Sequence, residues 1–149
     1  TIPWQWGTTS FTINTEQYTG PADSLALLFE PPAELQGQIG MFNSPDEVMA
    51  MAQIYLGLPA CNESTDDMRK VQDLLVAQKP FVKLYSSENI YERMAAGEVL
   101  AHQQWNGSAM RARAENPAVQ YVFPKEGVVT WMDNLAFAAG APNKDNAIK

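Results

Sequence analysis

The sequence contains few of the residues that hold metals, form disulfides or act as nucleophiles. Its 149 residues include one cysteine, Cys61, and one histidine, His102. A lone cysteine excludes an internal disulfide and a cysteine-based metal cluster, and the setting of Cys61 is that of a loop. His102 has no evident serine, cysteine or carboxylate partner that would make it a catalytic base. We therefore expect no enzymatic activity, no metal site and no cofactor.

Positive charge and long apolar runs are also scarce. The chain carries 10 Lys and Arg against 17 Asp and Glu, a net charge of -7. This balance disfavours nucleic acid and anionic membranes as partners and is compatible with a cationic ligand. No stretch approaches the roughly 18 apolar residues needed to span a bilayer. The first residues, 1–4, lack both an initiator Met and the apolar core of a signal peptide, so we expect a processed or internal start.

What the sequence does contain is an alternation of β-type and helical segments. The length and the 46% hydrophobic content predict one compact domain. Alternation of this kind predicts an α/β fold. We expect strands at 5–14, 38–42, 81–85, 99–104, 119–123 and 128–137, a turn at 124–127, helices after residues 24, 44, 64, 89 and 108, and a short helix at 144–149.

Two helix starts have recognisable capping patterns. Ser44 as N-cap, Pro45 at N1 and Glu47 at N3 have capping-box spacing, and an apolar stripe at 48, 51, 52 and 55 follows. Ser64 with Asp67 three residues later has the same form. Glu47 is therefore expected to cap its helix.

A tryptophan and a carboxylate two residues apart suggest a cation site. Residues i and i+2 of a strand share a face, so Trp131 and Asp133 would face one cavity while Met132 points into the core. The carboxylate would bind an ammonium group, and the indole would pack its methylene chain, adding about 0.5–2 kcal/mol of cation–π energy. The alternative is a core aromatic beside a capping or hinge carboxylate. Trp105, before Asn106-Gly107-Ser108, has a similar alternative as an aromatic at the sheet edge.

Several short motifs together resemble one family. They are Trp105-Asn106-Gly107-Ser108, Val122-Phe123-Pro124-Lys125-Glu126-Gly127, Trp131-Met132-Asp133-Asn134-Leu135-Ala136 and Asn143-Lys144-Asp145. Earlier in the chain, Trp6-Gly7-Thr8-Thr9, Ser44-Pro45-Asp46-Glu47-Val48, Tyr55-Leu56-Gly57 and Tyr85-Ser86-Ser87 follow in the same order. In residues and spacing they resemble the periplasmic spermidine/putrescine-binding proteins of bacterial polyamine ABC transporters.

The resemblance implies a specific fold and domain organisation. Members of this family have two α/β lobes joined by crossing strands, with polyamine bound between the lobes. The chain resembles the second lobe, so residues 1–149 are expected to form a single lobe of a type II periplasmic-binding-protein fold. Its sheet is expected to be mostly parallel and flanked by helices. The first lobe and the C-terminal segment would be absent.

The resemblance also assigns roles to individual residues. Trp105 matches the tryptophan that packs the methylene chain, and Trp131 with Asp133 matches an aromatic and carboxylate pair for an ammonium group. Glu47 matches a second carboxylate for amino groups further along the ligand. The same carboxylate could also cap its helix, and the two roles carry equal weight. Two positions are less typical, because Ser44 stands where relatives often carry an acid and Ser108 is the serine of spermidine-preferring members. The polyamine preferred is therefore left open, with Ser108 favouring the longer one.

These expectations define a function and its rivals. The resemblance implies a periplasmic, polyamine-binding component of an ABC uptake system, with a membrane permease as partner. Binding by the isolated lobe would be weak. One alternative is a lobe for another organic cation, such as a quaternary amine, or for an amino acid. The other is a self-associating fragment that forms a homodimer by exchanging terminal segments.

Overall fold

The computed structural model describes residues 1–148, which form one mixed sheet with helices on both faces. The long first strand, β1, spans Ile2–Asn14 and pairs with three others. The sheet has six strands in the order β3-β2-β4-β1-β5, and β6 also pairs with β1. The remaining strands are β2 (Ile39–Met41), β3 (Val82–Tyr85), β4 (Ala101–Trp105), β5 (Val119–Val122) and β6 (Val129–Leu135).

Strand direction confirms the expectation of a mostly parallel sheet. Strand β2 is parallel to both β3 and β4, whereas β1 is antiparallel to β4, β5 and β6. All strands in residues 1–148 except β1 therefore run in one direction. Helical crossovers connect β2 to β3 and β3 to β4, as parallel neighbours require.

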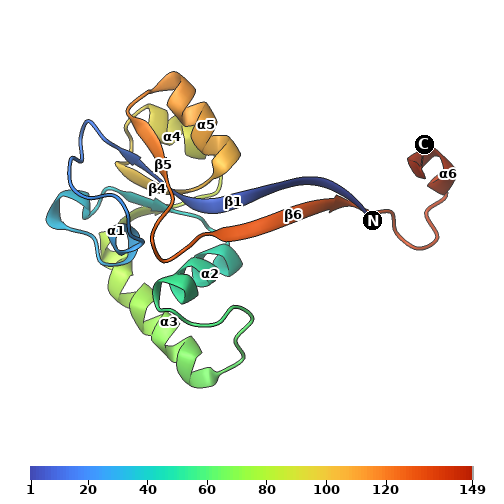
Figure 1. The fold of residues 1–149 in the computed structure, drawn as a ribbon, viewed down its shortest axis with the longest axis horizontal. Helices are drawn as coiled ribbons and strands as arrows, with labels where there is room; N and C mark the ends of the chain where they lie inside the picture. The colour runs from blue at the N-terminus through green and yellow to red at the C-terminus, as the bar shows by residue number, and fades with distance from the viewer. Residues whose placement is uncertain (149) are drawn as a thin grey trace.

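The helices divide between the two faces of the sheet. In Figure 1, α4 and α5 lie on one side of the sheet, and α1, α2 and α3 lie on the other. Each side has its own buried cluster. The helices are α1 (Ala26–Phe29), α2 (Pro45–Tyr55), α3 (Thr65–Gln78), α4 (Ile90–Ala95), α5 (Asn106–Glu115) and α6 (Lys144–Ile148), with short 3₁₀ turns at Ala33–Leu35 and Lys79–Phe81.

Alternation along β1 contributes to the larger core. Phe11 and Ile13 are buried with Leu28 and Met51, which come from α1 and α2. Each fully buried side chain of this size contributes roughly 1.5–3 kcal/mol. The smaller cluster, on the side of α4 and α5, is built around Met94. The two clusters confirm the predicted α/β layering.

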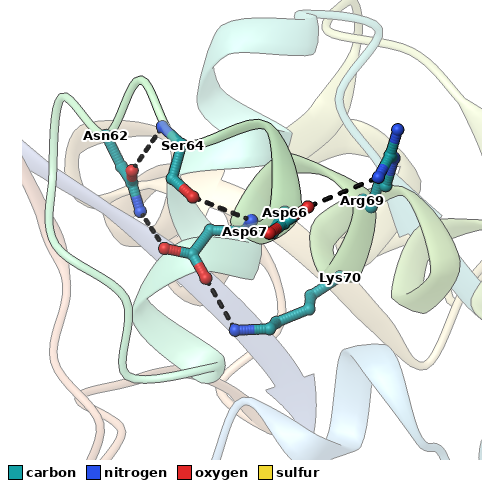
Figure 2. A network of polar contacts seen from close by, with 6 residues as sticks. All are labelled: Asn62, Ser64, Asp66, Asp67, Arg69 and Lys70. Atoms are coloured by element: carbon teal, nitrogen blue, oxygen red, sulfur yellow. Dashed lines mark hydrogen bonds and ion pairs between the residues drawn. The ribbon is translucent and has the colours of Figure 1, made fainter.

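The start of α3 shows the predicted capping (Figure 2). The Asp67 backbone N–H donates to Ser64 Oγ at 3.3 Å. The Asp67 carboxylate accepts from Asn62 Nδ2 and from Lys70 Nζ, both at 2.7 Å. This network satisfies an otherwise unpaired N–H group at the helix start and places negative charge near the positive end of the helix dipole.

Strands β1 and β6 continue together beyond the body of the molecule as a two-stranded ribbon (Figure 1). Along it, Ile2 pairs with Leu135 and Thr9 with Val129. Met132 on this ribbon is 59% exposed. The prediction that Met132 points into the core is therefore wrong, because it lies on the ribbon opposite Trp6, which is itself 73% exposed.

Two further expectations differ from the structure at segment ends. The helix expected after residue 108 begins earlier, because β4 extends to Trp105 and α5 begins at once with Asn106. The final helix, expected at 144–149, is observed as Lys144–Ile148, and Lys149 lies outside the described residues. Among residues 1–148, no helix is long and apolar enough to cross a membrane.

Candidate ligand-binding cleft

A cleft of about 770 Å³ lies where α2 and α5 begin. These helices follow β2 and β4 directly, so the cleft is at the carboxyl ends of parallel strands. Ligands bind at this edge in open α/β sheets. The base of the β1–β6 ribbon forms a further wall. The lining residues are Gln5 and Trp6 from β1, Asp46, Glu47 and Ala50 from α2, Trp105 from β4, Asn106, Gly107, Ser108 and Arg111 from α5, and Val129, Trp131 and Asp133 from β6.

The register of β1 and β6 positions Trp131. This residue is directly opposite Gly7. A Cβ atom added to Gly7 would lie 2.4 Å from Cζ2 of Trp131 and 2.6 Å from Oδ1 of Asn106. The indole therefore lies across the Gly7 backbone. Asn106 Oδ1 also accepts the backbone N–H of Thr8 at 3.2 Å, which joins the start of α5 to β1.

Asp133 lies one step further along the same face of β6. It is opposite Gln5, whose Nε2 donates to Asp133 Oδ2 at 2.8 Å. Trp131 and Asp133 both line the cleft, as expected for residues i and i+2 of a strand. The carboxylate is exposed, and Gln5 restricts its orientation without neutralising it. Asp133 is therefore available to a cation.

Glu47 joins α2 to the strands at the base of the cleft. Its Oε2 accepts Thr9 Oγ1 at 2.7 Å and the indole N–H of Trp105 at 2.9 Å. The Trp105 ring also packs against Phe42, with ring centroids 4.6 Å apart. Glu47 thus fixes the orientation of Trp105 and brings a negative charge to the cleft.

The capping-box prediction for α2 is wrong. This helix start has no side-chain cap hydrogen bond. Ser44 Oγ instead donates to Asp46 Oδ1 at 2.7 Å, and this bond lowers the pKa of the Asp46 carboxyl group. The Glu47 side chain is turned toward Thr9 and Trp105, where it accepts two hydrogen bonds. Pro45 at the first helical position still favours the helix start.

The structure brings together five of the six site residues expected from the sequence. Trp105, Trp131, Asp133, Glu47 and Ser108 all line the cleft. Ser44 does not line the cleft, and its hydroxyl group donates to the Asp46 carboxylate.

Sequence reasoning missed four polar lining residues. Gln5 and Asn106 reach the cleft through the strand register and the junction of β4 with α5, which no local pattern reveals. Asp46 follows from its place in the first turn of α2. Arg111 follows Ser108 by three residues, a spacing that puts both on one face of a helix and could have identified it.

The lining residues determine what the cleft can do chemically. Three carboxylates, from Asp46, Glu47 and Asp133, share the cleft with one guanidinium, from Arg111. Two indoles, Trp105 and Trp131, supply apolar surface beside the carboxylates. The lining contains no histidine, cysteine or lysine, and residues 1–148 contain no group of three potential metal ligands. The arrangement suits binding of a cation that has an apolar stem.

Known proteins share both the sequence and the fold. The spermidine/putrescine-binding periplasmic protein of Escherichia coli K12 is 33% identical over 149 residues, covering 99% of this chain and 42% of that protein. The putrescine/agmatine-binding protein of Pseudomonas aeruginosa PAO1 is 27% identical over 157 residues, covering 95% of this chain and 43% of that protein. The chain therefore spans less than half the length of these relatives.

Solved structures agree on the fold. A spermidine/putrescine ABC transporter substrate-binding protein from Streptococcus pneumoniae superposes with a TM-score of 0.81 at 22% identity, covering 89% of this chain and 41% of that one. A lipoprotein of Treponema pallidum superposes with a TM-score of 0.83 at 17% identity, covering 97% of this chain and 46% of that one. At these identities the likeness shows the fold alone.

The family comparison covers the entire sequence. Residues 1–149 match the family described as bacterial extracellular solute-binding protein. A solute-binding family agrees with the expectation that the chain is not an enzyme. The chain belongs to the bacterial extracellular solute-binding proteins.

Proposed function

We propose that this chain is a polyamine-binding lobe. The observation that carries the proposal is the placement of Asp133, Trp131, Trp105 and Glu47 around one cleft. One ammonium group binds the exposed Asp133 carboxylate, and the methylene chain packs on the indoles. Glu47 holds Trp105 in place through its Oε2 and contributes negative charge for a second amino group.

The whole protein would use this lobe as one half of its binding site. The E. coli relative, of which the chain covers 42%, is named for binding spermidine and putrescine in the periplasm. We propose that residues 1–149 are the second of two lobes, and that closure of a first lobe over the cleft excludes water from the ligand. A periplasmic location and delivery to a membrane permease follow from the same proposal.

Replacement of Asp133 with asparagine tests the proposal. In the native full-length protein, D133N removes the charge and keeps the shape, so affinity for a diamine should fall by about 2–3 kcal/mol. Titration calorimetry with putrescine measures this change. Asp73→Asn, on the exposed surface of α3 and away from the cleft, is the matched control for net charge. An unchanged affinity in D133N would contradict the role of Asp133.

Self-association is the second candidate, favoured by the exposed apolar side chains of the ribbon. Trp4 is 68% exposed and Trp6 is 73% exposed, and both lie on β1 where it leaves the body. Exchange of the β1–β6 ribbon between two copies would bury them. Size-exclusion chromatography with light scattering of residues 1–149 distinguishes the candidates, since a strict monomer at high concentration contradicts segment exchange.

A further inference from the structure

Arg111 is a cation in a cleft that otherwise carries only negative charge. It lies on α5 and lines the cleft together with Ser108, one turn earlier. Its guanidinium lies over the Tyr91 ring, 5.8 Å from the ring centroid. It makes no ion pair with any residue of the described range 1–148. No carboxylate of these residues is therefore within ion-pair distance of Arg111, although Glu92 and Glu115 carry negative charge near the same Tyr91 ring.

Charge is distributed unevenly between the two helices that begin at the cleft. The first turn of α2 carries Asp46 and Glu47, which offset the positive end of its helix dipole. The first turn of α5 carries no acidic residue, and Arg111 follows in the next turn. Asp133 is on β6, outside α5. The cleft thus has an acidic side formed by α2 and β6 and a basic side formed by α5.

A ligand with several ammonium groups would experience these two sides differently. The acidic side attracts each ammonium group, whereas an ammonium group near Arg111 meets like charge at short range in a partly desolvated site. A molecule whose charges all fit on the acidic side avoids this repulsion. A longer molecule with a further charge does not.

We propose that Arg111 is a selectivity determinant that excludes an additional ammonium group from the α5 side, so that the cleft prefers diamines to triamines. This inference rests on the proposed polyamine function and adds the ligand class to it. It also differs from the expectation that Ser108 favours the longer polyamine. The charge of Arg111, three residues further on, has a larger effect on an ammonium group than the neutral hydroxyl group of Ser108.

The test compares putrescine and spermidine binding to the native full-length protein by titration calorimetry. The unchanged protein should bind putrescine more tightly. Arg111→Gln, which keeps a polar stem beside Tyr91, should raise spermidine affinity about three- to tenfold and change putrescine affinity less than about twofold. Arg111→Lys keeps the charge and should keep the preference.

Arg113 provides the matched control. It is an exposed arginine on the same helix that does not line the cleft, so Arg113→Gln should leave both affinities within about twofold. Two results would overturn the inference about Arg111 and leave the proposed function in place. One is tighter binding of spermidine than of putrescine by the unchanged protein, and the other is an equal shift of both affinities in Arg111→Gln. Failure of the unchanged protein to bind either amine would overturn the proposed function, and the inference with it.

Discussion

Gly7 is the residue at which β1 makes room for the Trp131 indole. A methyl group there would lie 2.4 Å from Cζ2 of the ring and 2.6 Å from Asn106 Oδ1, closer than van der Waals contact allows. Gly7→Ala should therefore displace the indole and destabilise the fold by roughly 1–3 kcal/mol. Thermal unfolding and the tryptophan emission spectrum measure the two effects. At Gly107, where nothing lies within 4 Å of an added Cβ, alanine should not lower the Tm.

His102 gives the fold a predictable response to acid. It is fully buried on β4, and burial lowers its pKa to about 4 from an ordinary value near 6.5. Between these values the unfolded chain binds a proton that the folded chain does not, so the free energy of unfolding falls as pH falls from about 6.5 to about 4. The histidine contribution amounts to about 3 kcal/mol across this window.

A neutral replacement isolates this contribution. In His102→Gln, the free energy of unfolding from urea titrations should depend less steeply on pH between about 6.5 and 4 than in the unchanged chain. Above pH 7 the variant loses packing against Gly40 but gains no pH dependence. Equal slopes in the two proteins would show that His102 is protonated, or accessible, in the folded state.

At the scale of elements, two helices begin with a serine at the N-cap position but use it differently. Ser64 Oγ accepts the Asp67 N–H, whereas Ser44 makes no cap hydrogen bond to its helix. Ser64→Ala should therefore lower the free energy of unfolding by about 1 kcal/mol. Ser44→Ala should lower the free energy of unfolding by clearly less, because Ser44 makes no cap hydrogen bond. Urea unfolding of the two variants checks this difference, and equal losses would argue against the capping assignment.

For the whole molecule, the geometry predicts weak binding by residues 1–149 alone. The Asp133 carboxylate and the Trp6 indole face solvent, so a ligand in the cleft would remain partly hydrated. Charge-assisted bonds and cation–π contacts are weaker in water than in a closed site. Calorimetry should therefore give a dissociation constant in the range of about micromolar to millimolar for a polyamine. A submicromolar dissociation constant would refute this prediction.

The sequence by itself determined the features that depend on local periodicity. The apolar positions Val48, Met51 and Ala52 are buried, because a helical stripe has the same spacing wherever the helix docks. Trp131 and Asp133 share the cleft, because alternation is a property of the strand. Ser64 caps α3 because its partner is only three residues away.

Only the tertiary structure decided the features that depend on residues far apart in the chain. Met132 is exposed because the ribbon leaves the body, although alternation placed it in the core. The Glu47 carboxylate binds Thr9 and Trp105, which are 38 and 58 residues away, and so does not cap its helix. Arg111 reaches the cleft because α5 begins beside β1. Local patterns carry no information about such contacts, since strand register and helix docking bring these residues together only in the folded chain.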